Sequence, residues 1–391
     1  MRFPEFSGEW KKHSLGEIGE TIIGLTYKPS DVVDNNGIIV FRSSNIKNGM
    51  IDYSDLVRVN KHIKDKIITK ENDILVCARN GSQRLIGKNA IIKQEDANNT
   101  FGAFMMVYRA NDNPFILPLL STKKYFSQVG ENLGARINQI TTSDFNGFEF
   151  YFPENHAERT KIAELFRLLD ERIATQNKII EKLQSLIKGL NDNIHKGIKG
   201  ETVCFSDLGE AYSGLSGKGG DDFGYGEPFI TYMNVYQNTY ISEKDYELVQ
   251  IAPNEKQNSV QYGDALFTLS SETPEEVGIG AVYLGNTQKL YLNSFCFGIH
   301  FYDERVLPQY LAHFISSSSF RRAIYPLAQG STRFNLQKND FMKMKFLLPS
   351  LEKQGHIANT LDALHCRLAN EKSLTEQYIL LKKYLLSLMF I

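Results

Sequence analysis

The second half of the chain repeats the first half. Residues 134–153 read GARINQITTSDFNGFEFYFP, and residues 330–349, about 196 positions later, read GSTRFNLQKNDFMKMKFLLP. With one single-residue gap the two stretches share a glycine, an Arg-x-Asn triplet (residues 136–138 and 333–335), an Asp-Phe pair and a proline. Each stretch is followed by a long run of helix-forming residues. A repeat of this length predicts two copies of one folding unit, each with its own core.

The residues in front of each shared ending have strand-like patterns. Short runs rich in aromatic and β-branched residues, such as ILVCA at 74–78 and ALFTLS at 265–270, are bounded by Gly, Asn, Asp or Pro. Residues 118–133 and 308–328 look helical. The pattern predicts an α+β domain followed by one long helix, twice. The expected boundaries are 1–153 for the first domain, 154–199 for the first helix, 200–349 for the second domain and 350–391 for the second helix.

Both long helices carry a heptad stripe. In the first, ten positions between residues 162 and 194 follow a 4-3-4-3 spacing, and all except Gln176 are apolar. As one helix, residues 162–194 would be roughly 50 Å long at 1.5 Å per residue. The second helix keeps the pattern less regularly. The predicted contact positions are Ile162, Phe166, Leu169, Ile173, Gln176, Ile180, Leu183, Ile187, Leu190, Ile194, Ile357, Leu361, Leu364, Leu368, Glu371, Tyr378 and Leu385.

Two helices of matched length in one chain are expected to pack on each other as an antiparallel coiled coil. Gln176 and Glu371 are equivalent in the repeat, and we expect them to meet near the middle and to set the register, as single buried polar residues do. The alternative is that both are solvent-facing interruptions of the stripe. A second apolar row on the C-terminal helix (Leu374, Leu381 and Leu388) indicates that the pair binds further helices.

Composition excludes several classes of protein. The four cysteines are far apart and form no CxxC pair, which argues against a disulfide framework and against a zinc site. No apolar run approaches the ~20 residues of a membrane span, and the N-terminus lacks the apolar segment of a signal peptide. We therefore expect a cytoplasmic protein with no membrane partner. Residues 1–150 carry 19 basic and 17 acidic residues, whereas residues 201–350 carry 11 and 17, so a nucleic-acid role must accommodate an acidic second domain.

Sequence patterns of catalysis are incomplete in this chain. DNPF at 112–115 lacks the second proline of the amino-methyltransferase motif, and GLSGKGGDDFG at 214–224 lacks the spacing of a phosphate-binding loop. GIGAVYLG at 278–285 is too short for a dinucleotide fingerprint, and the eight histidines form no HExxH. These observations favour a binding protein with no cofactor of its own over an enzyme.

The architecture resembles the specificity subunit of type I restriction–modification systems. The resemblance covers essentially the whole chain and rests on order and duplication: FPEFSGEW at 3–10, ARNGSQRLIG at 78–87, the glycine-rich 214–224 with ITYMNV at 230–235, and the two repeated endings. It implies that each domain is a target recognition domain reading one half of a split, asymmetric site in double-stranded DNA. It also implies that the helices set the distance between the half-sites, where roughly 50 Å corresponds to about 15 base pairs.

The resemblance also implies partners. In this family the helices dock modification subunits, which bind S-adenosylmethionine and methylate adenine N6. A nuclease and translocase subunit joins them to cut unmethylated DNA. The specificity subunit does no chemistry itself, and this chain is expected to be a non-catalytic part of such a complex.

In the first domain the strongest candidate contacts lie in a basic segment. Residues 61–88 carry seven basic and three acidic residues, and within them a strand is followed by ARNGSQR, where Gly81 permits a tight turn. Arginine suits guanine in the major groove, and Asn or Gln suits adenine. An ordinary basic hairpin is the alternative. The candidates are Arg79, Asn80, Ser82, Gln83, Arg84 and Lys88, with Ser43 and Asn45 as weaker contacts, and Arg136 and Asn138 for phosphate contact or structure.

In the second domain the equivalent loop, LSSETPEEVG at 269–278, is acidic, and Arg79 has no counterpart. Two alternatives stay open for base reading. One is the set of Ser270, Ser271 and Thr273 in this same loop, and the other is the glycine-rich loop of Lys218 together with Thr231, Tyr232 and Asn234. Arg333 and Asn335, which recur from the first domain, are expected to contact phosphate or to have a structural role. The candidates are Lys218, Thr231, Tyr232, Asn234, Ser270, Ser271, Thr273, Arg333 and Asn335.

Two rival interpretations stay open on the sequence alone. One is a coiled-coil scaffold whose domains bind other proteins, which the acidic second domain favours. The other is a single-chain DNA-modifying enzyme, but the repeat fills the 391 residues and leaves no room for a catalytic segment. An intact but unexpressed specificity cassette is a variant of the first interpretation.

Overall fold

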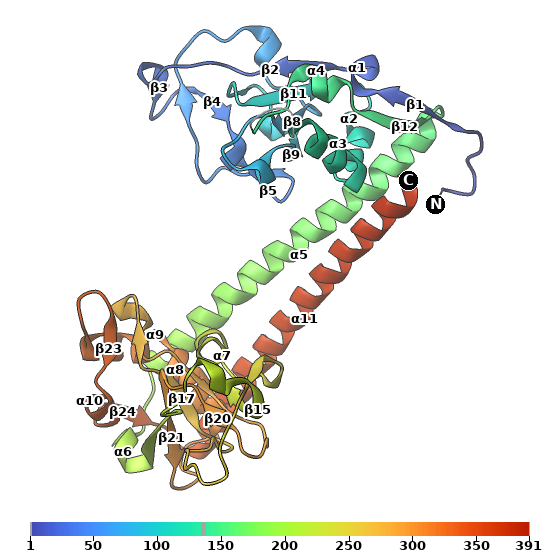
Figure 1. Ribbon diagram of the computed structural model, residues 1–391. Coiled ribbons are helices and arrows are strands. Elements are labelled where there is room, and N and C mark those ends of the chain that lie inside the picture. Colours follow the sequence, from blue (N-terminus) through green and yellow to red (C-terminus); the bar gives the residue numbers. More distant parts are fainter. Residues whose placement is uncertain (1, 134–137, 391) are drawn as a thin grey trace. The chain divides into compact units, whose positions relative to one another are not determined.

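The computed structural model describes residues 2–133 and 138–390, and the chain divides into two units (Figure 1). Unit 1 comprises Met1–Asn177 with Ser373–Ile391, and unit 2 comprises Lys178–Lys372. Both divisions fall inside long helices, α5 (His156–Lys196) and α11 (Leu351–Met389). Each unit therefore holds one mixed domain together with part of both helices.

Unit 1 is built around an antiparallel sheet with the strand order β2-β11-β8-β9. Its central strand β8 is buried along its whole length, so its sequence is a continuous apolar run without alternation. The elements of this domain are β1 (Trp10–Ser14), α1 (Leu15–Ile18), β2 (Glu20–Ile23), β3 (Val32–Val33), β4 (Ile38–Phe41), β5 (Ile46–Lys47), β6 (Met50–Ile51), β7 (Arg58–Val59), β8 (Ile74–Cys77), β9 (Asn89–Ile91), β10 (Thr100–Phe101), β11 (Met105–Arg109), α2 (Asn113–Leu119), α3 (Lys123–Leu133), α4 (Thr142–Asn146) and β12 (Glu149–Pro153).

Unit 2 repeats this sheet with the order β14-β21-β17-β19, again antiparallel throughout. A short ladder joins the first and last strands of each domain, β1 with β12 and β13 with β24. The duplicated α+β fold is therefore confirmed. The elements of the second domain are β13 (Glu201–Cys204), α6 (Phe205–Leu208), β14 (Gly209–Ser213), β15 (Phe223–Ile230), α7 (Tyr232–Gln237), β16 (Tyr246–Val249), β17 (Ala265–Thr268), β18 (Ser270–Ser271), β19 (Gly280–Val282), β20 (Tyr291–Leu292), β21 (Cys296–Phe301), α8 (Pro308–Ser316), α9 (Ser318–Ile324), β22 (Ala328–Gln329), β23 (Phe334–Leu336), α10 (Lys338–Met342) and β24 (Lys345–Leu348).

One buried aspartate anchors the central strand in each copy. The Asp73 carboxylate accepts hydrogen bonds from Arg109 at 2.8 and 2.6 Å and from the Lys70 backbone N–H at 2.8 Å. At the equivalent place, Asp264 lies 2.9 Å from the His300 ring and accepts a 2.7 Å bond from the Tyr212 hydroxyl. A buried carboxylate needs such partners to offset its desolvation. The scaffold is therefore shared, whereas the group that pairs with the aspartate differs.

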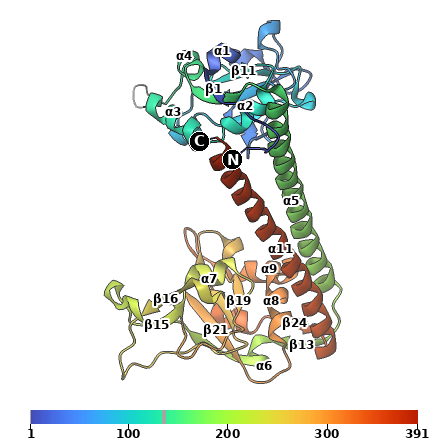
Figure 2. The same cartoon turned by 90° about the vertical axis from the view of Figure 1, so that its right-hand side faces the viewer.

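Within each unit, α5 and α11 run side by side and antiparallel (Figures 1 and 2). In unit 1, the Lys382 ammonium lies 2.5 Å from the Asp170 carboxylate, and the rings of Phe166 and Phe390 stack 5.9 Å apart. Residue numbers therefore fall along α11 as they rise along α5. In unit 2 the same direction follows from the core, where the C-terminal end of α5, Leu190 and Ile194, packs with the N-terminal end of α11. The antiparallel pairing agrees with the sequence prediction.

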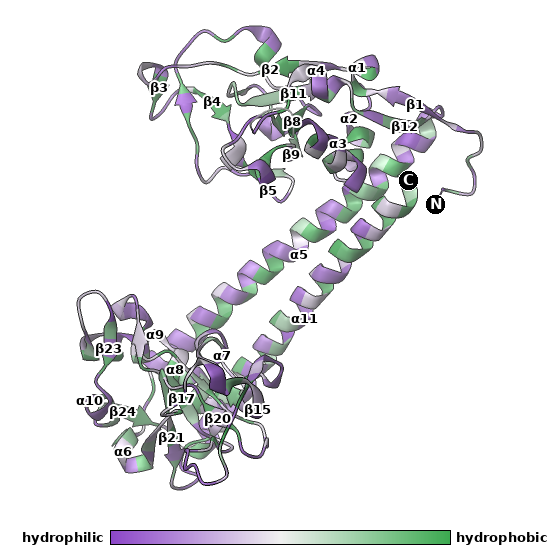
Figure 3. Cartoon of the chain, viewed as in Figure 1, coloured by the Kyte–Doolittle hydropathy of each residue, from purple (hydrophilic) through white to green (hydrophobic). Residues whose placement is uncertain are grey.

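The heptad stripe faces inward on both helices. Every predicted contact position is buried or half-buried, and the hydropathy colouring in Figure 3 shows apolar and polar residues alternating along both helices. Gln176 and Glu371 are only 2% and 5% exposed, so they are not solvent-facing interruptions. Thr375 and Lys382, which break the apolar pattern, occupy buried and half-buried places in the same stripe. The register role of Gln176 and Glu371 stays a prediction.

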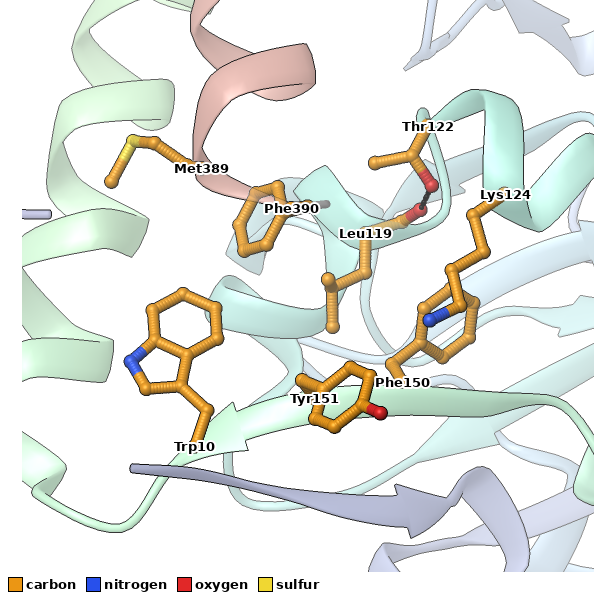
Figure 4. Close-up of a pocket in the computed structure, with 8 residues that line it drawn as sticks. All are labelled: Trp10, Leu119, Thr122, Lys124, Phe150, Tyr151, Met389 and Phe390. Atoms are coloured by element: carbon orange, nitrogen blue, oxygen red, sulfur yellow. Dashed lines mark hydrogen bonds between the residues drawn. The ribbon is translucent and has the colours of Figure 1, made fainter. Parts of the chain in front are cut away.

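The C-terminal end of α11 is docked on the first domain. The Phe390 ring lies 6.0 Å from Trp10 and 5.8 Å from Phe115, beside a small pocket lined also by Lys124 and Tyr151 (Figure 4). The N-terminal segment is held at the other helix, where the Arg2 guanidinium donates to the fully buried Glu158 carboxylate at 2.7 and 2.6 Å. Both ends of the described chain thus contribute to the core of unit 1.

Two buried histidines lie where α5 and α8 pack in unit 2. The His195 ring lies 5.6 Å from both Tyr310 and Phe314, and its Nδ1 is 2.9 Å from the Asn191 carbonyl oxygen. Nε2 of His195 is buried and has no hydrogen-bond partner among the described residues. His313 Nε2 lies 2.8 Å from the Asp362 carboxylate. Burial lowers the pKa of both histidines below the ordinary value, so both are neutral in the folded protein near pH 7.

Unit 2 is therefore expected to lose stability on mild acidification. Unfolded histidine takes up a proton below about pH 6.5 and the folded form resists it, so each residue lowers the free energy of unfolding by up to about 1.4 kcal/mol per pH unit below that value. The variant His195→Phe keeps the ring stacking and removes one titrating group. Urea unfolding between pH 7.5 and 5.5 should show a shallower pH dependence in this variant than in the wild type. An identical dependence would contradict the assignment.

Candidate nucleic-acid interface

Unit 1 contains a cleft of about 790 Å³ on the first domain. It is formed by the segments that follow β2, β4 and β8 and by the turn before β11. Its lining includes two arginines and no carboxylate, and of the two arginines only Arg42 is paired with a carboxylate of the described residues, that of Asp55. The lining residues are Leu25, Thr26, Tyr27, Arg42, Ser43, Ser44, Arg79, Asn80, Gly81, Gly102, Ala103, Phe104, Met105 and Asn138.

The cleft brings together residues that are far apart in the sequence. Strand β8 ends at Cys77, and Arg79 then pairs with Gln139 in an isolated antiparallel bridge. The Asn80 amide donates to the Ser43 hydroxyl at 2.9 Å, and the Asn138 amide donates to the Gly81 carbonyl at 3.1 Å. Four candidates from the sequence, Arg79, Asn80, Ser43 and Asn138, therefore share one site. Whether they contact DNA stays a prediction.

Several other first-domain candidates lie elsewhere. Gln83 and Arg84 are exposed on a 3₁₀ turn, Gln83–Leu85, and Ser82 and Lys88 flank it half-buried. None of these four lines the cleft. Arg136 lies outside the described residues. The basic segment is also partly neutralised, because Lys61 and Lys66 lie 3.4 and 3.2 Å from the carboxylates of Asp31 and Glu20.

Asn45 and Asn234 hold loops together. Both are buried. The Asn45 amide donates to the carbonyls of Asp52 and Asp55 at 3.1 and 2.8 Å, and the Asn234 amide donates to the Ser242 carbonyl at 2.8 Å. These amides are used within the fold, and their contact with DNA stays a prediction that the burial does not favour. Asparagine suits both roles because its amide can bond to backbone as readily as to a base.

The second domain has the same framework around different side chains. The Leu269 N–H donates to the Phe295 carbonyl at 2.8 Å, as the Ala78 N–H does to the Phe104 carbonyl at 3.0 Å. This equivalence places Ser270 where the first domain has Arg79. The Tyr232 hydroxyl donates to the Ser270 carbonyl at 3.0 Å, and burial raises the pKa of that tyrosine. Tyr232 is therefore a neutral side chain beside this site at physiological pH.

Three of the second-domain candidates are committed to structure. Lys218 is nearly buried and lies 2.6 Å from the Glu255 carboxylate, whose pKa its ammonium lowers to about 2. Ser270 and Ser271 are buried, and the Ser271 hydroxyl donates to the Thr273 carbonyl. A DNA contact by these three side chains stays a prediction, which their burial and internal pairing do not favour. The remaining candidates are accessible: Thr231, whose hydroxyl caps α7 at 3.2 Å from the Asn234 N–H, and the exposed Thr273, Arg333 and Asn335.

The backbone also corrects one detail of the repeat. Ser270 pairs with Asn335, as Arg79 pairs with Gln139, and the N–H groups of Leu336 and Ile140 make matching bonds to Leu269 and Ala78. Asn335 is therefore equivalent to Gln139 and not to Asn138. Asn138 has a φ of 55°, so the chain turns locally there.

Sequence reasoning missed three residues at these sites. Arg42 lines the cleft and lies 2.8 Å from the Asp55 carboxylate. Phe104 and Phe295, just before β11 and β21, are exposed although their sequence context resembles core. Their exposure could have been suspected from their position, because each phenylalanine follows a small residue and stands just before a buried strand.

No helix within the described ranges is long and apolar enough to cross a membrane. Across residues 2–133 and 138–390 no three His, Cys, Asp or Glu side chains are grouped as metal ligands would be.

The fold and the site define a tandem DNA-recognition protein. Residues 7–185 and 200–377 match the family described as the type I restriction modification DNA specificity domain, and the chain belongs to this family. It is a non-catalytic specificity subunit whose two domains suit a bipartite site.

Two relatives show how far the similarity extends. The chain is 24% identical over 387 residues to the type I restriction enzyme EcoKI specificity subunit of Escherichia coli strain K12, covering 91% of this chain and 82% of that one. It is 26% identical over 187 residues to the StySPI specificity subunit of Salmonella potsdam, covering 46% and 40%.

Solved structures share the fold. The S subunit of a type I system from M. genitalium has a TM-score of 0.59 at 14% identity, covering 100% of this chain and 99% of that one. A chain from a study of complex assembly and conformational transition of the type I system has a TM-score of 0.57 at 15% identity, covering 98% of each. The duplicated architecture is thus shared with these structures although only about one residue in seven is identical.

Proposed function

We propose that each domain reads one half of a split, asymmetric DNA site, and that the first-domain cleft is one contact surface. The observation that carries this proposal is the pairing of one framework with different side chains: Arg79 occupies the place that Ser270 takes in the second copy. Identical frameworks position the two readers alike, and unlike side chains give unlike base preferences. The site is then necessarily asymmetric.

The long helices act as the spacer between the half-sites in this proposal. Helix α5 has 41 residues, which at 1.5 Å per residue is about 60 Å of helix. Its inward stripe pairs with α11 in both units, and a paired helix is stiffer than a single one. The spacing of the half-sites then depends on the helices and the bases read depend on the domains. The protein acts where chromosomal DNA is held, in the cytoplasm.

The helices also supply a docking surface for the modification subunits. On the part of α11 that belongs to unit 1, Leu380 and Tyr384 are 63% and 60% exposed and lie one turn apart, with the exposed Ile379 and Leu381 beside them. Exposed apolar side chains grouped on one helix favour contact with another protein. The modification subunit would carry S-adenosylmethionine, and the restriction subunit would join the assembled methyltransferase.

The double variant Leu380→Glu/Tyr384→Glu is expected to lose most of its binding to the modification subunit, because two carboxylates cannot be buried in an apolar interface without partners. Co-purification and sedimentation of the mixed subunits measure this. The control Leu380→Met/Tyr384→Phe keeps the apolar surface and should bind normally. Equal binding by both variants would place the docking surface elsewhere.

A selection from randomised DNA duplexes tests the proposed function. The full chain, assembled with its modification subunits, is incubated with the pool, and bound duplexes are sequenced. We expect two short, unlike motifs separated by a fixed number of unspecified base pairs. Enrichment of no motif, with partner binding intact, would favour the scaffold interpretation.

A further inference from the structure

Two exposed phenylalanines occupy the same place in the two domains. Phe104 is 60% exposed and Phe295 is 54% exposed. Each stands directly before a central strand, β11 or β21. Its carbonyl accepts a hydrogen bond from the backbone N–H just after the neighbouring strand, from Ala78 after β8 at 3.0 Å and from Leu269 after β17 at 2.8 Å. A large aromatic ring left in solvent forgoes burial that would stabilise the fold. Its occurrence at one position in both copies indicates a common use.

An arginine covers each of these rings. The Arg79 guanidinium carbon lies 5.2 Å from the centre of the Phe104 ring, and that of Arg333 lies 5.7 Å from the centre of the Phe295 ring. The two arginines come from different segments. Arg79 follows β8, whereas Arg333 precedes β23, the strand that pairs with the Ser270 position. Both domains therefore pair an arginine with this phenylalanine, although the arginine comes from a different segment of the chain in each domain.

These two guanidinium groups have all of their donors available. Among the arginines within residues 2–133 and 138–390, only Arg79, Arg84 and Arg333 have a guanidinium group that makes neither a hydrogen bond nor an ion pair to another described residue. Arg84 has no aromatic ring beneath it in that part of the chain. A guanidinium on an aromatic face is held by cation–π attraction, which uses none of its five N–H donors. The arrangement limits rotamer freedom without using up donors.

The forked N–H donors of a guanidinium match the edge of guanine better than the edges of the other bases. Arginine bonds to O6 and N7 of guanine with two parallel hydrogen bonds, which is the commonest specific contact in the major groove. A guanidinium already held over a ring loses less freedom on making these two bonds than a free one. A phosphate contact would need only charge, and a lysine would provide that charge as well as an arginine.

We propose that Phe104 and Phe295 are aromatic platforms, each presenting one arginine, Arg79 or Arg333, to a guanine in the half-site that its domain reads. The inference rests on the proposed two-domain reading and adds the base class and the residues. Arg79 and Arg333 contact the base, and the phenylalanines are positioning residues. Each half of the target site therefore contains at least one G·C pair read by an arginine.

Conservative variants of both partners test the proposal. Phe104→Leu removes the ring and keeps an apolar side chain, and Arg79→Lys keeps the charge and removes the fork. Each variant, as the full chain assembled with its modification subunits, is put through the selection from randomised duplexes. We expect both variants to lower the preference for one G·C pair in the first half-site by about tenfold or more and to leave the second half unchanged. Phe295→Leu and Arg333→Lys should do the converse.

The outcomes separate the alternatives. A uniform loss of affinity with unchanged base preferences would overturn the inference in favour of phosphate contact. So would unchanged preferences at unchanged affinity, or a wild-type half-site without a G·C pair. Phe126→Leu, an exposed aromatic on α3, is the control and should select the wild-type motif. Should Phe104→Leu fold poorly, the exposed Arg79→Lys decides alone. A wild type that selects no motif refutes the proposed function itself.

Discussion

Phe341→Ala is expected to lower the free energy of unfolding of unit 2 by about 3–5 kcal/mol, the usual cost of removing a buried phenylalanine ring. Phe341 is fully buried, stacks on Phe205 at 5.0 Å and lies 4.9 and 5.5 Å from the rings of Phe267 and Phe297. These rings come from four different elements. The surrounding residues cannot all move into the vacated space, so a cavity remains and adds to the loss.

Hydrogen exchange in the two central strands measures this effect in each unit separately. Amides of β17 should lose protection in Phe341→Ala, whereas amides of β8 should keep theirs. The matched variant Phe145→Ala, at the equivalent position in unit 1, should reverse the pattern. The lone tryptophan, Trp10, belongs to unit 1, so its fluorescence should respond to Phe145→Ala only. Equal loss in both strands from either variant would contradict two separate cores.

Gly24→Ala is expected to distort the first-domain cleft and to weaken reading of the first half-site. A Cβ added at Gly24 would lie 2.2 Å from the Gly102 carbonyl oxygen and 2.4 Å from that of Phe101. Both atoms belong to backbone, so no side-chain rotation relieves the contact, and the end of β2 must move away from the turn that carries Phe104. Overpacking of this kind costs about 1–3 kcal/mol.

The equivalent change in the second domain is Gly214→Ala, whose Cβ would lie 2.1 Å from the Asn293 carbonyl oxygen near Phe295. Each variant should broaden base preference in its own half-site and lower the urea midpoint of its own unit. Gly130→Ala on α3 is the control, because nothing lies within 4 Å of its added Cβ. It should raise stability slightly, since alanine favours helix by about 1 kcal/mol over glycine. Tolerance of Gly24→Ala in both assays would contradict the close backbone approach.

The helices could be predicted from sequence because their spacing alone determines which side chains face inward. The 4-3 pattern placed Gln176 in the stripe, and its burial follows from that position. The sheets could be predicted as strands, but their order could not. That order depends on which distant segments pair, as in the ladder of β11 with both β2 and β8.

The contact surface was predicted less well, for a physical reason. Residue type reveals what a side chain can bond to, and the partner that it finds depends on the fold. Lys218 looked free in its glycine-rich loop, yet Glu255, 37 positions away, pairs with it. Phe104 looked like core and is exposed. Arg79 and Asn80 line one cleft beside Gly81, and their contact with DNA stays a prediction.

The most direct test of the central claim is a base-modification map of host DNA, read by long-read sequencing, with this gene intact and with it deleted. The proposal predicts that N6-methyladenine disappears on deletion at one split, asymmetric motif, and that exchanging residues 1–150 for those of a relative changes one half of that motif only. An unchanged map on deletion of an expressed gene would contradict the account.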